Sequence, residues 1–275
     1  MNIRRSLYSA DKDRGRVAAA GPGIVLALVA TIILTGQVAP ALAGQLLEDV
    51  PGVRALHWYI GTLRLPSGGL LTASGDAKVV VGADAAALQQ LLNGAGPPPE
   101  AYFRVKGYGT VQYFRCGCGY IQADDWQCIN ADDVLASLTR NYPDAQGEDV
   151  LGWAIPPHYD PSTETITYML HARDDDVGEF YDGIAMVLGR YGVEIIEAGT
   201  RKMDYTTTLT MLRRGVAAFR FAPGYRYSDH APSDTISPNH IAKAFLLNAF
   251  ATDLAQSYTD CRISVAPQPR FTSQG

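Results

Sequence analysis

The sequence predicts an α+β fold in which a mainly antiparallel sheet packs with helices, on the plan of an α/β/α sandwich. Four strand-like segments follow one another between residues 150 and 198, and their links are too short for the crossover that a parallel pair needs. Segments with the helical spacing of apolar residues stand before and after this group. The 275 residues, 47% of them hydrophobic and without a fixed-period repeat, suit one hydrophobic core.

The first part of the expected domain contains strands around a turn, followed by a helix. Short apolar runs between Gly61 and Val81 flank the turn residues 66–69. A helix fits Ala85–Asn93, with Asp84 as its cap and Gly94 where it stops.

Two further strands and a second helix come next. The segments Tyr102–Lys106 and Thr110–Arg115 are rich in aromatic and β-branched residues, which favour strands. The second helix begins at Asn130, whose side chain suits a cap, and is expected to end before Pro143.

The clearest pattern is a pair of hairpins. The expected strands are Val150–Tyr159, Thr165–Ala172, Tyr181–Leu188 and Val193–Ala198. A tight turn at residues 189–192 joins the last two, so we expect all four to pair antiparallel in sequence order.

Two helices complete the domain. One begins at Asp204 and places Tyr205, Leu209 and Leu212 on one stripe. The last helix, Asn239–Leu254, starts after Pro238 and has a wide apolar face.

The N-terminal segment 1–43 has the pattern of an export signal. Five basic residues precede an apolar core at Ile24–Leu34, and a small-residue motif predicts cleavage after Ala43. The core is too short to cross a hydrocarbon layer of about 30 Å, which favours cleavage. A retained membrane anchor is the alternative, because no charged residue occurs from Val17 to Leu47.

In both cases the basic residues stay in the cytoplasm and the rest of the chain is delivered outside it. We therefore expect a location in the periplasm, or at the inner membrane facing the periplasm. Residues 44–263 form a single α+β domain, and residues 264–275 form a flexible tail.

The charge of the chain excludes one class of partner. The formal net charge is −5, and residues 44–275 carry 18 basic against 26 acidic residues, a net charge of −8. Binding to nucleic acid needs a basic excess, so no nucleic-acid partner is expected.

Four cysteines in an exported chain suggest disulfides. Cys116, Cys118, Cys128 and Cys261 allow three pairings, and the sequence does not choose among them. A metal site formed by Cys116, Cys118 and Cys128 is the rival interpretation, although it lacks a neighbouring His or a second paired ligand group.

The chain contains no nucleophile elbow, zinc-protease motif, phosphate-binding loop or dinucleotide fingerprint. No catalytic, cofactor-binding or metal-binding residue is therefore assigned, and no cofactor is expected. His158 and Asp160 share one strand end with Ser162 nearby, which leaves a hydrolase of unknown substrate as an alternative. Ser162 more simply satisfies backbone groups within a turn.

The tight turn after residue 188 offers a weak contact site. Arg190 and Tyr191 place a cation and an aromatic ring on a rigid hairpin, although turn chemistry explains only the flanking glycines. Arg190 and Tyr191, together with His158 and Asp160, are therefore weak candidates for contact with a partner or a lipid headgroup.

Three sequence blocks resemble a known family. Residues 152–160 read Gly-Trp-Ala-Ile-Pro-Pro-His-Tyr-Asp, and the tracts at 187–193 and 223–229 follow in matching order and spacing. Over about residues 60–245 the chain resembles the bacterial family of predicted membrane-anchored proteins catalogued as domain of unknown function 2167. The resemblance implies an exported, envelope-associated protein with no assigned reaction.

Two departures from that family matter. Its members commonly carry a hydrophobic C-terminal anchor, which is not seen before Gly275, and Cys116, Cys118 and Cys128 fall outside the family pattern. The leading interpretation is a non-enzymatic envelope protein that binds an unknown envelope protein or a lipid surface. The alternatives are the hydrolase and a periplasmic metal-handling protein.

Overall fold

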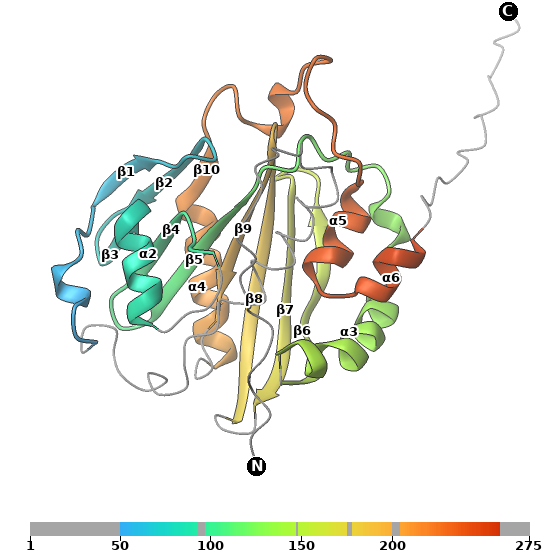
Figure 1. Cartoon of the computed structure of the whole chain (residues 1–275), viewed down its shortest axis with the longest axis horizontal. Coiled ribbons are helices and arrows are strands. Elements are labelled where there is room, and N and C mark those ends of the chain that lie inside the picture. The colour runs from blue at the N-terminus through green and yellow to red at the C-terminus, as the bar shows by residue number, and fades with distance from the viewer. Residues whose placement is uncertain (1–49, 93–96, 147, 175–177, 200–203, 259–275) are drawn as a thin grey trace, which may run out of the picture.

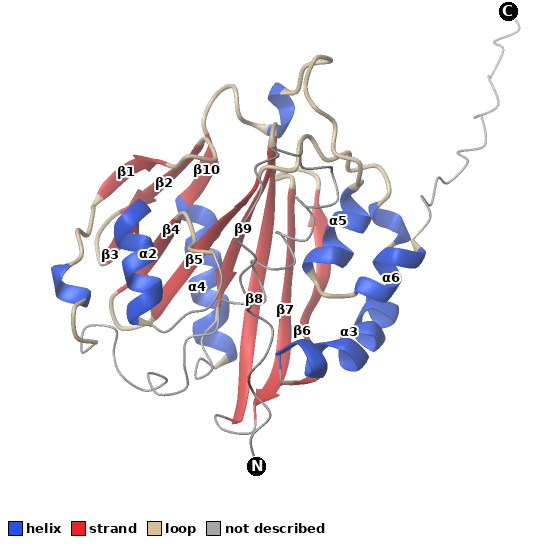
Figure 2. Ribbon diagram, viewed as in Figure 1, coloured by secondary structure: helices blue, strands red, loops and turns tan. Residues whose placement is uncertain are grey.

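The computed structural model describes residues 50–92, 97–146, 148–174, 178–199 and 204–258. Ten strands form two antiparallel sheets in this part of the chain, and helices pack on both sides of the larger sheet (Figure 1, Figure 2). The predicted α+β class is confirmed. The predictions for segment 1–43, with cleavage after Ala43, and for the tail 264–275 concern residues outside the described ranges.

The larger sheet has seven strands in the order β3-β4-β5-β9-β8-β7-β6, and every neighbouring pair is antiparallel. Its strands are β3 (Ala77–Val81), β4 (Ala101–Val105), β5 (Gly109–Cys116), β6 (Asp149–Asp160), β7 (Thr165–Asp174), β8 (Gly178–Gly189) and β9 (Gly192–Ala198). The two predicted hairpins supply the last four strands, as expected. The pairing of β5 with β9 then joins them to the earlier strands across about eighty residues.

Four helices cover one face of this sheet, here called the helical face (Figure 1). They are α2 (Gly82–Leu91), α3 (Ala131–Gln146), α5 (Ile241–Asn248) and α6 (Thr252–Ser257). Short 3-10 turns stand at Val53–Ala55, Trp126–Cys128 and Tyr227–Asp229. The apolar side chains of β7, β8 and β9 on this side pack with Phe245 and Leu246 of α5.

The opposite face carries helix α4 (Tyr205–Ala218) and a three-stranded sheet, β1-β2-β10 (Figure 2). The small sheet consists of β1 (Gly61–Arg64), β2 (Gly69–Ala73) and β10 (Phe219–Phe221). Packing here is close enough to require glycines. A Cβ on Gly215 of α4 would lie 2.8 Å from Val111 Cγ1, and one on Gly189 would lie 2.6 Å from the ring of Phe221.

The local signals for helix starts hold at two of three positions. The Asp204 carboxylate accepts a hydrogen bond from the Thr207 amide at 2.8 Å, and the Asn130 side chain accepts one from the Asp132 amide at 3.0 Å. The predicted Asp84 cap is wrong, because α2 starts earlier and its N-cap position is Val81, which makes no side-chain cap. Asp84 instead stands in the first turn, where its charge still suits the helix dipole.

Helix α3 does not end before Pro143. It runs to Gln146, so the proline lies in its last turns. A proline removes one backbone donor but leaves the neighbouring turns hydrogen-bonded, which is why it was a poor guide to this helix end.

The single C-terminal helix predicted at Asn239–Leu254 is two helices. Phe250 between them has a φ of 58°, in the left-handed region, and its side chain is buried in the core. The Ala251 amide donates to the Leu246 carbonyl at 2.9 Å, which closes α5 in the manner of a left-handed cap. Burial of the ring outweighs the backbone strain at this position.

The buried stripe of α4 differs in part from the prediction, because Leu212 is buried as expected whereas Leu209 is only partly buried. Thr208, Met211, Leu212 and Gly215 are buried, whereas Tyr205 is 40% exposed. Gly215 allows the helix backbone to approach the sheet closely, because a Cβ there would lie 2.8 Å from Val111 Cγ1.

None of the helices within the described ranges combines the length and apolar character needed to span a bilayer.

Candidate functional site

The rim of the larger sheet where β5 ends and the β8–β9 turn lies brings together several of the residues singled out from the sequence. Cys116 is the last residue of β5, and it forms a disulfide with Cys118, with their Cα atoms 5.3 Å apart. Cys116 is 5% exposed, whereas Cys118 is only partly buried. The bridge therefore has one sulfur in the core and one near the surface.

The β8–β9 turn packs directly on this bridged loop. A Cβ on Gly192 would lie 1.8 Å from the Cys116 carbonyl oxygen, so only glycine permits the approach. The Gly119 amide donates to the Tyr191 carbonyl at 3.3 Å. Tyr120, two residues beyond the bridge, also hydrogen-bonds to Thr235 and Ser237, so the disulfide loop is held between the hairpin and the segment before α5.

An apolar cleft opens beside the disulfide on the helical face. Its floor comes from β5, β8 and β9, and its wall comes from α5 and the segment before it. The lining residues are Cys116, Cys118, Ile121, Met186, Val193, Ile195, Ser237, Asn239, Ala244 and Leu247. The cleft is small, about 20 Å³, and Ala244 and Leu247 in its wall are partly exposed.

A second, more polar cleft meets the same disulfide from the other side of the rim. Ser67, Arg115, Cys116, Tyr191, Gly192, Val193 and Phe221 line it. Cys116 is thus shared by both clefts. The arrangement offers an apolar binding surface, a disulfide and a cation within one short stretch of rim.

Arg190 and Tyr191 lie in the turn as predicted, but the two residues differ in availability. Tyr191 is 42% exposed. The Arg190 guanidinium donates to both carboxylate oxygens of Asp234, at 2.7 and 2.9 Å, and only about a fifth of its side chain is exposed. This arginine fixes the loop after β10 and is not the free cation that the sequence suggested.

The same loop is stiffened by rings. The Tyr120 ring stacks on His230, with centroids 3.8 Å apart, and on Tyr227, with centroids 4.5 Å apart. The Tyr227 hydroxyl donates to the Ile121 carbonyl at 2.7 Å. Burial raises the pKa of Tyr227 above the ordinary tyrosine value, so it stays a neutral donor.

The disulfide selects among the three pairings left open by the sequence. Cys116–Cys118 belongs to the pairing whose second bridge joins Cys128 to Cys261, and Cys261 lies outside the described residues. Metal ions bind thiolates, so two of the three sulfurs proposed as metal ligands are not ligands in this oxidised form. The metal interpretation is not favoured.

His158 and Asp160 stand on edge strand β6, where His158 is exposed. The Asp160 carboxylate accepts hydrogen bonds from the Ser162 amide and hydroxyl, at 2.8 and 2.7 Å. These bonds lower the pKa of Asp160, and they give Ser162 the turn role that the sequence favoured. The hydroxyl therefore donates to Asp160, an arrangement typical of a turn rather than of a nucleophile aligned with His158.

The sequence pattern did not predict two buried glutamates. Every residue of β9 is buried, including Glu194 and Glu197, which face opposite sides of the sheet. Neither carboxylate oxygen of Glu194 has a hydrogen-bond partner within the described residues, nor does Oε2 of Glu197. Burial raises the pKa of both groups well above the usual range, which favours their neutral forms.

Asp182 and Glu148 add to the acidic character near Glu197. Burial, followed by repulsion from Glu148, raises the pKa of Asp182 to about 7. A strand with alternating residues predicts exposure of every second side chain, and only the central place of β9 in the sheet buries both of its faces. No local pattern identifies these acids.

A second carboxylate group lies at the start of α5. Ligand atoms of Asp124, Asp125 and His240 all fall within 4.8 Å of one another. Both carboxylate oxygens of Asp125 already accept a hydrogen bond, one from the Ala242 amide at 2.9 Å and one from the Tyr258 hydroxyl at 2.6 Å. This trio anchors the helix start.

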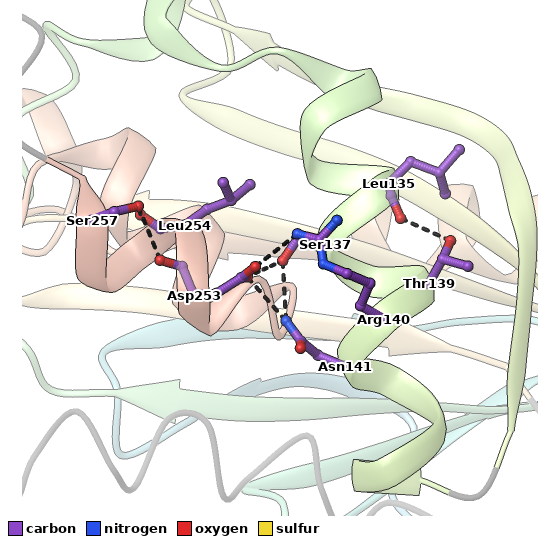
Figure 3. Close-up of polar contacts among 8 residues, drawn as sticks. All are labelled: Leu135, Ser137, Thr139, Arg140, Asn141, Asp253, Leu254 and Ser257. Carbon is purple, nitrogen blue, oxygen red and sulfur yellow. Dashed lines mark hydrogen bonds and ion pairs between the residues drawn. The ribbon is translucent and has the colours of Figure 1, made fainter.

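Figure 3 shows a polar cluster that joins α3 to α6. Asp253 accepts hydrogen bonds from Ser137, from Asn141 at 2.9 Å and from Arg140 at 2.8 Å. The Ser137 bond and the Arg140 pair lower the pKa of Asp253 to about 2. All of these polar groups serve the helix–helix contact, so the cluster is structural.

Comparisons with known proteins give one family and one distant structure. The family model described as "Protein of unknown function (DUF2167)" matches residues 60–245. The solution structure of cyanobacterial PsbP (CyanoP) from Synechocystis sp. PCC 6803 matches with 14% identity and a TM-score of 0.34, covering 60% of this chain and 92% of that one. No curated protein matches.

Proposed function

Because this chain belongs to the DUF2167 family, whose function is unknown, we propose a role from its own geometry: an exported binding module of the bacterial envelope. Its ligand is an apolar peptide segment of another envelope protein, held in the cleft beside Cys116 and Cys118. The single observation that carries the proposal is this cleft, whose lining is apolar and in part exposed although the rest of the core is closely packed.

Shape favours a peptide as the occupant. The cleft is small, about 20 Å³, so it admits one apolar group at the end of a side chain, and Ser237 and Asn239 are among its lining residues. A flat lipid surface would instead need a broad, exposed apolar face.

Charge favours a protein partner as well. Residues 44–275 carry a net charge of −8, which repels the anionic headgroups of bacterial membranes. The same charge attracts a segment with basic residues on either side of its apolar core.

Binding of a defined peptide tests the proposal. The probe is a fluorescein-labelled decapeptide with two central leucines flanked by lysines, and its control has serines in place of the leucines. We expect only the leucine peptide to raise the fluorescence anisotropy. Leu247→Asp should weaken binding by about tenfold, about 1.4 kcal/mol, because it places a charge in the apolar wall.

Leu151→Asp is the matched control, since Leu151 is 42% exposed on edge strand β6. Equal binding of the two peptides, or equal loss in the two variants, would contradict the proposal. Sedimentation of the chain with phosphatidylglycerol vesicles in place of peptide binding would contradict it too and point to a lipid surface.

A further inference from the structure

We propose that Cys116–Cys118 is an exchange-active disulfide that oxidises a pair of thiols on the polypeptide held in the adjacent cleft. For the identity of its substrate this inference rests on the proposed binding function. The exchange chemistry itself rests on the bridge, its exposure and its neighbours.

The bridge does little for the fold that other contacts do not already do. It spans only Gly117, and a disulfide that closes so short a loop restrains the unfolded chain the least. Cys116 is already fixed by its pairing with Val193 and by the close approach of Gly192. A structural bridge gains most where it joins distant segments, which this one does not.

The two sulfurs are unequal in a way that suits exchange. Cys116 is almost fully buried at the end of a central strand, whereas Cys118 lies beyond the strand and is partly exposed. An incoming thiolate therefore meets Cys118 first, and Cys116 is the sulfur that leaves.

A cation lies near the backbone of the bridged loop. Arg115 and Cys116 line the same polar cleft, and the Arg115 Nε and Nη2 atoms lie 3.7 Å from the point where a Cβ on Gly117 would stand. Because Arg115 and Cys116 are consecutive residues of β5, their side chains leave opposite faces of the sheet, and the guanidinium lies on the Gly117 side of the loop and not against the Cys116 sulfur. The apolar cleft, lined by both cysteines, supplies the place where a substrate segment lies during attack.

The exchange balances in two steps. One substrate thiolate bonds to Cys118 Sγ, the Cys116–Cys118 bond breaks, and Cys116 leaves as a thiolate that takes up a proton. The second substrate thiolate then attacks the substrate sulfur of the mixed disulfide and releases Cys118. The substrate dithiol is oxidised to a disulfide, and the Cys116–Cys118 disulfide is reduced to two thiols.

A redox titration of the full chain tests the bridge alone. The chain is equilibrated with reduced and oxidised glutathione at a series of ratios, the thiols are trapped by alkylation, and the peptides that carry each cysteine are measured by mass spectrometry. We expect the Cys116–Cys118 disulfide to be reduced, and both of its cysteines to be alkylated, at glutathione ratios where Cys128 remains unalkylated. Reduction of Cys116 and Cys118 only at ratios that also expose Cys128 would overturn the inference.

Two single variants test the direction of attack. The leucine decapeptide, now with one cysteine activated by thionitrobenzoate, reacts with a free protein thiol and releases a yellow product. We expect Cys116→Ser, which leaves Cys118 free, to react at least tenfold faster than Cys118→Ser. Equal rates would contradict the assignment of Cys118 as the attacked sulfur.

The Leu247→Asp variant separates the two proposals. It should slow the reaction with the leucine peptide and leave the glutathione titration unchanged. An unchanged peptide rate together with easy opening by glutathione would reject the cleft as the binding site and retain the exchange-active bridge. A bridge that resists reduction by glutathione while the peptide still binds would reject the exchange-active bridge and retain the cleft as the binding site.

Discussion

The two faces of the seven-stranded sheet are built in different ways. On the opposite face, glycines let α4 and the phenylalanines of β10 approach the sheet to contact distance. On the helical face, the covering elements leave an apolar cleft beside the disulfide, and carboxyl groups stand near the core. The opposite face is therefore the scaffold, and the helical face keeps side chains available for a partner.

The largest expected effect is overpacking of the scaffold face. Gly215→Val should lower the free energy of unfolding by about 3 kcal/mol, because its first added carbon already falls within 2.8 Å of Val111. Denaturant unfolding measures the change. Gly152→Ala is the control, since a Cβ at Gly152 meets nothing within 4 Å, and an equal loss there would remove the contrast between the faces.

The next effect concerns a carboxyl group of the helical face. Asp182 has a folded pKa of about 7 against an ordinary 3.8, so its ionisation costs stability as pH rises between these values. Asp182→Asn should be about 2 kcal/mol more stable than the wild type at pH 8 and equal at pH 4. We expect this stability difference to be smaller than a fully buried carboxylate would give, because the Asp182 side chain is partly exposed.

Thermal unfolding of the wild type and of Asp182→Asn across this pH range measures how their stability difference depends on pH. A constant difference at all pH values would mean that the substitution acts through packing and not through ionisation.

The third prediction is that the Cys116–Cys118 disulfide contributes little to the free energy of unfolding. The loop-entropy relation gives about 1.5 kcal/mol for a three-residue loop, so Cys118→Ser should cost no more than that in free energy of unfolding. A loss of 4 kcal/mol or more would show a structural disulfide and weaken the case for exchange.

The smallest effect is expected at the α3–α6 junction. Asp253 has its pKa lowered to about 2, so it stabilises the fold above pH 4 and loses this contribution as pH falls toward 2. Asp253→Asn should cost about 1 kcal/mol at pH 7, because the carboxylate is substantially exposed. The two chains should converge near pH 2, and a persistent gap there would contradict the electrostatic origin.

Local patterns sufficed for the hairpins and for the helix starts at Asn130 and Asp204, because alternation, short links and side-chain caps act over a few residues. They failed at Phe250, where burial of a ring against distant strands forces a left-handed residue and divides the helix. Such a break depends on tertiary packing and leaves no local signal.

The site was visible only in part. Cys-x-Cys and the Tyr191 turn stand out in the sequence, but their contact with Ser237, Ala244 and Leu247 depends on the placement of α5 over the sheet. Arg190 looked like a free cation because its partner, Asp234, lies 44 residues away. The buried glutamates of β9 depend on a strand order that joins segments eighty residues apart.

Backbone amide chemical-shift mapping with the leucine decapeptide locates the surface that binds the peptide. We expect titration to shift the amides of Cys118, Val193 and Leu247, around the cleft, and to leave those of α4 and the small sheet unmoved. Shifts concentrated on α4 or on β1-β2-β10, with the cleft unperturbed, would contradict the assignment of the helical face as the binding surface.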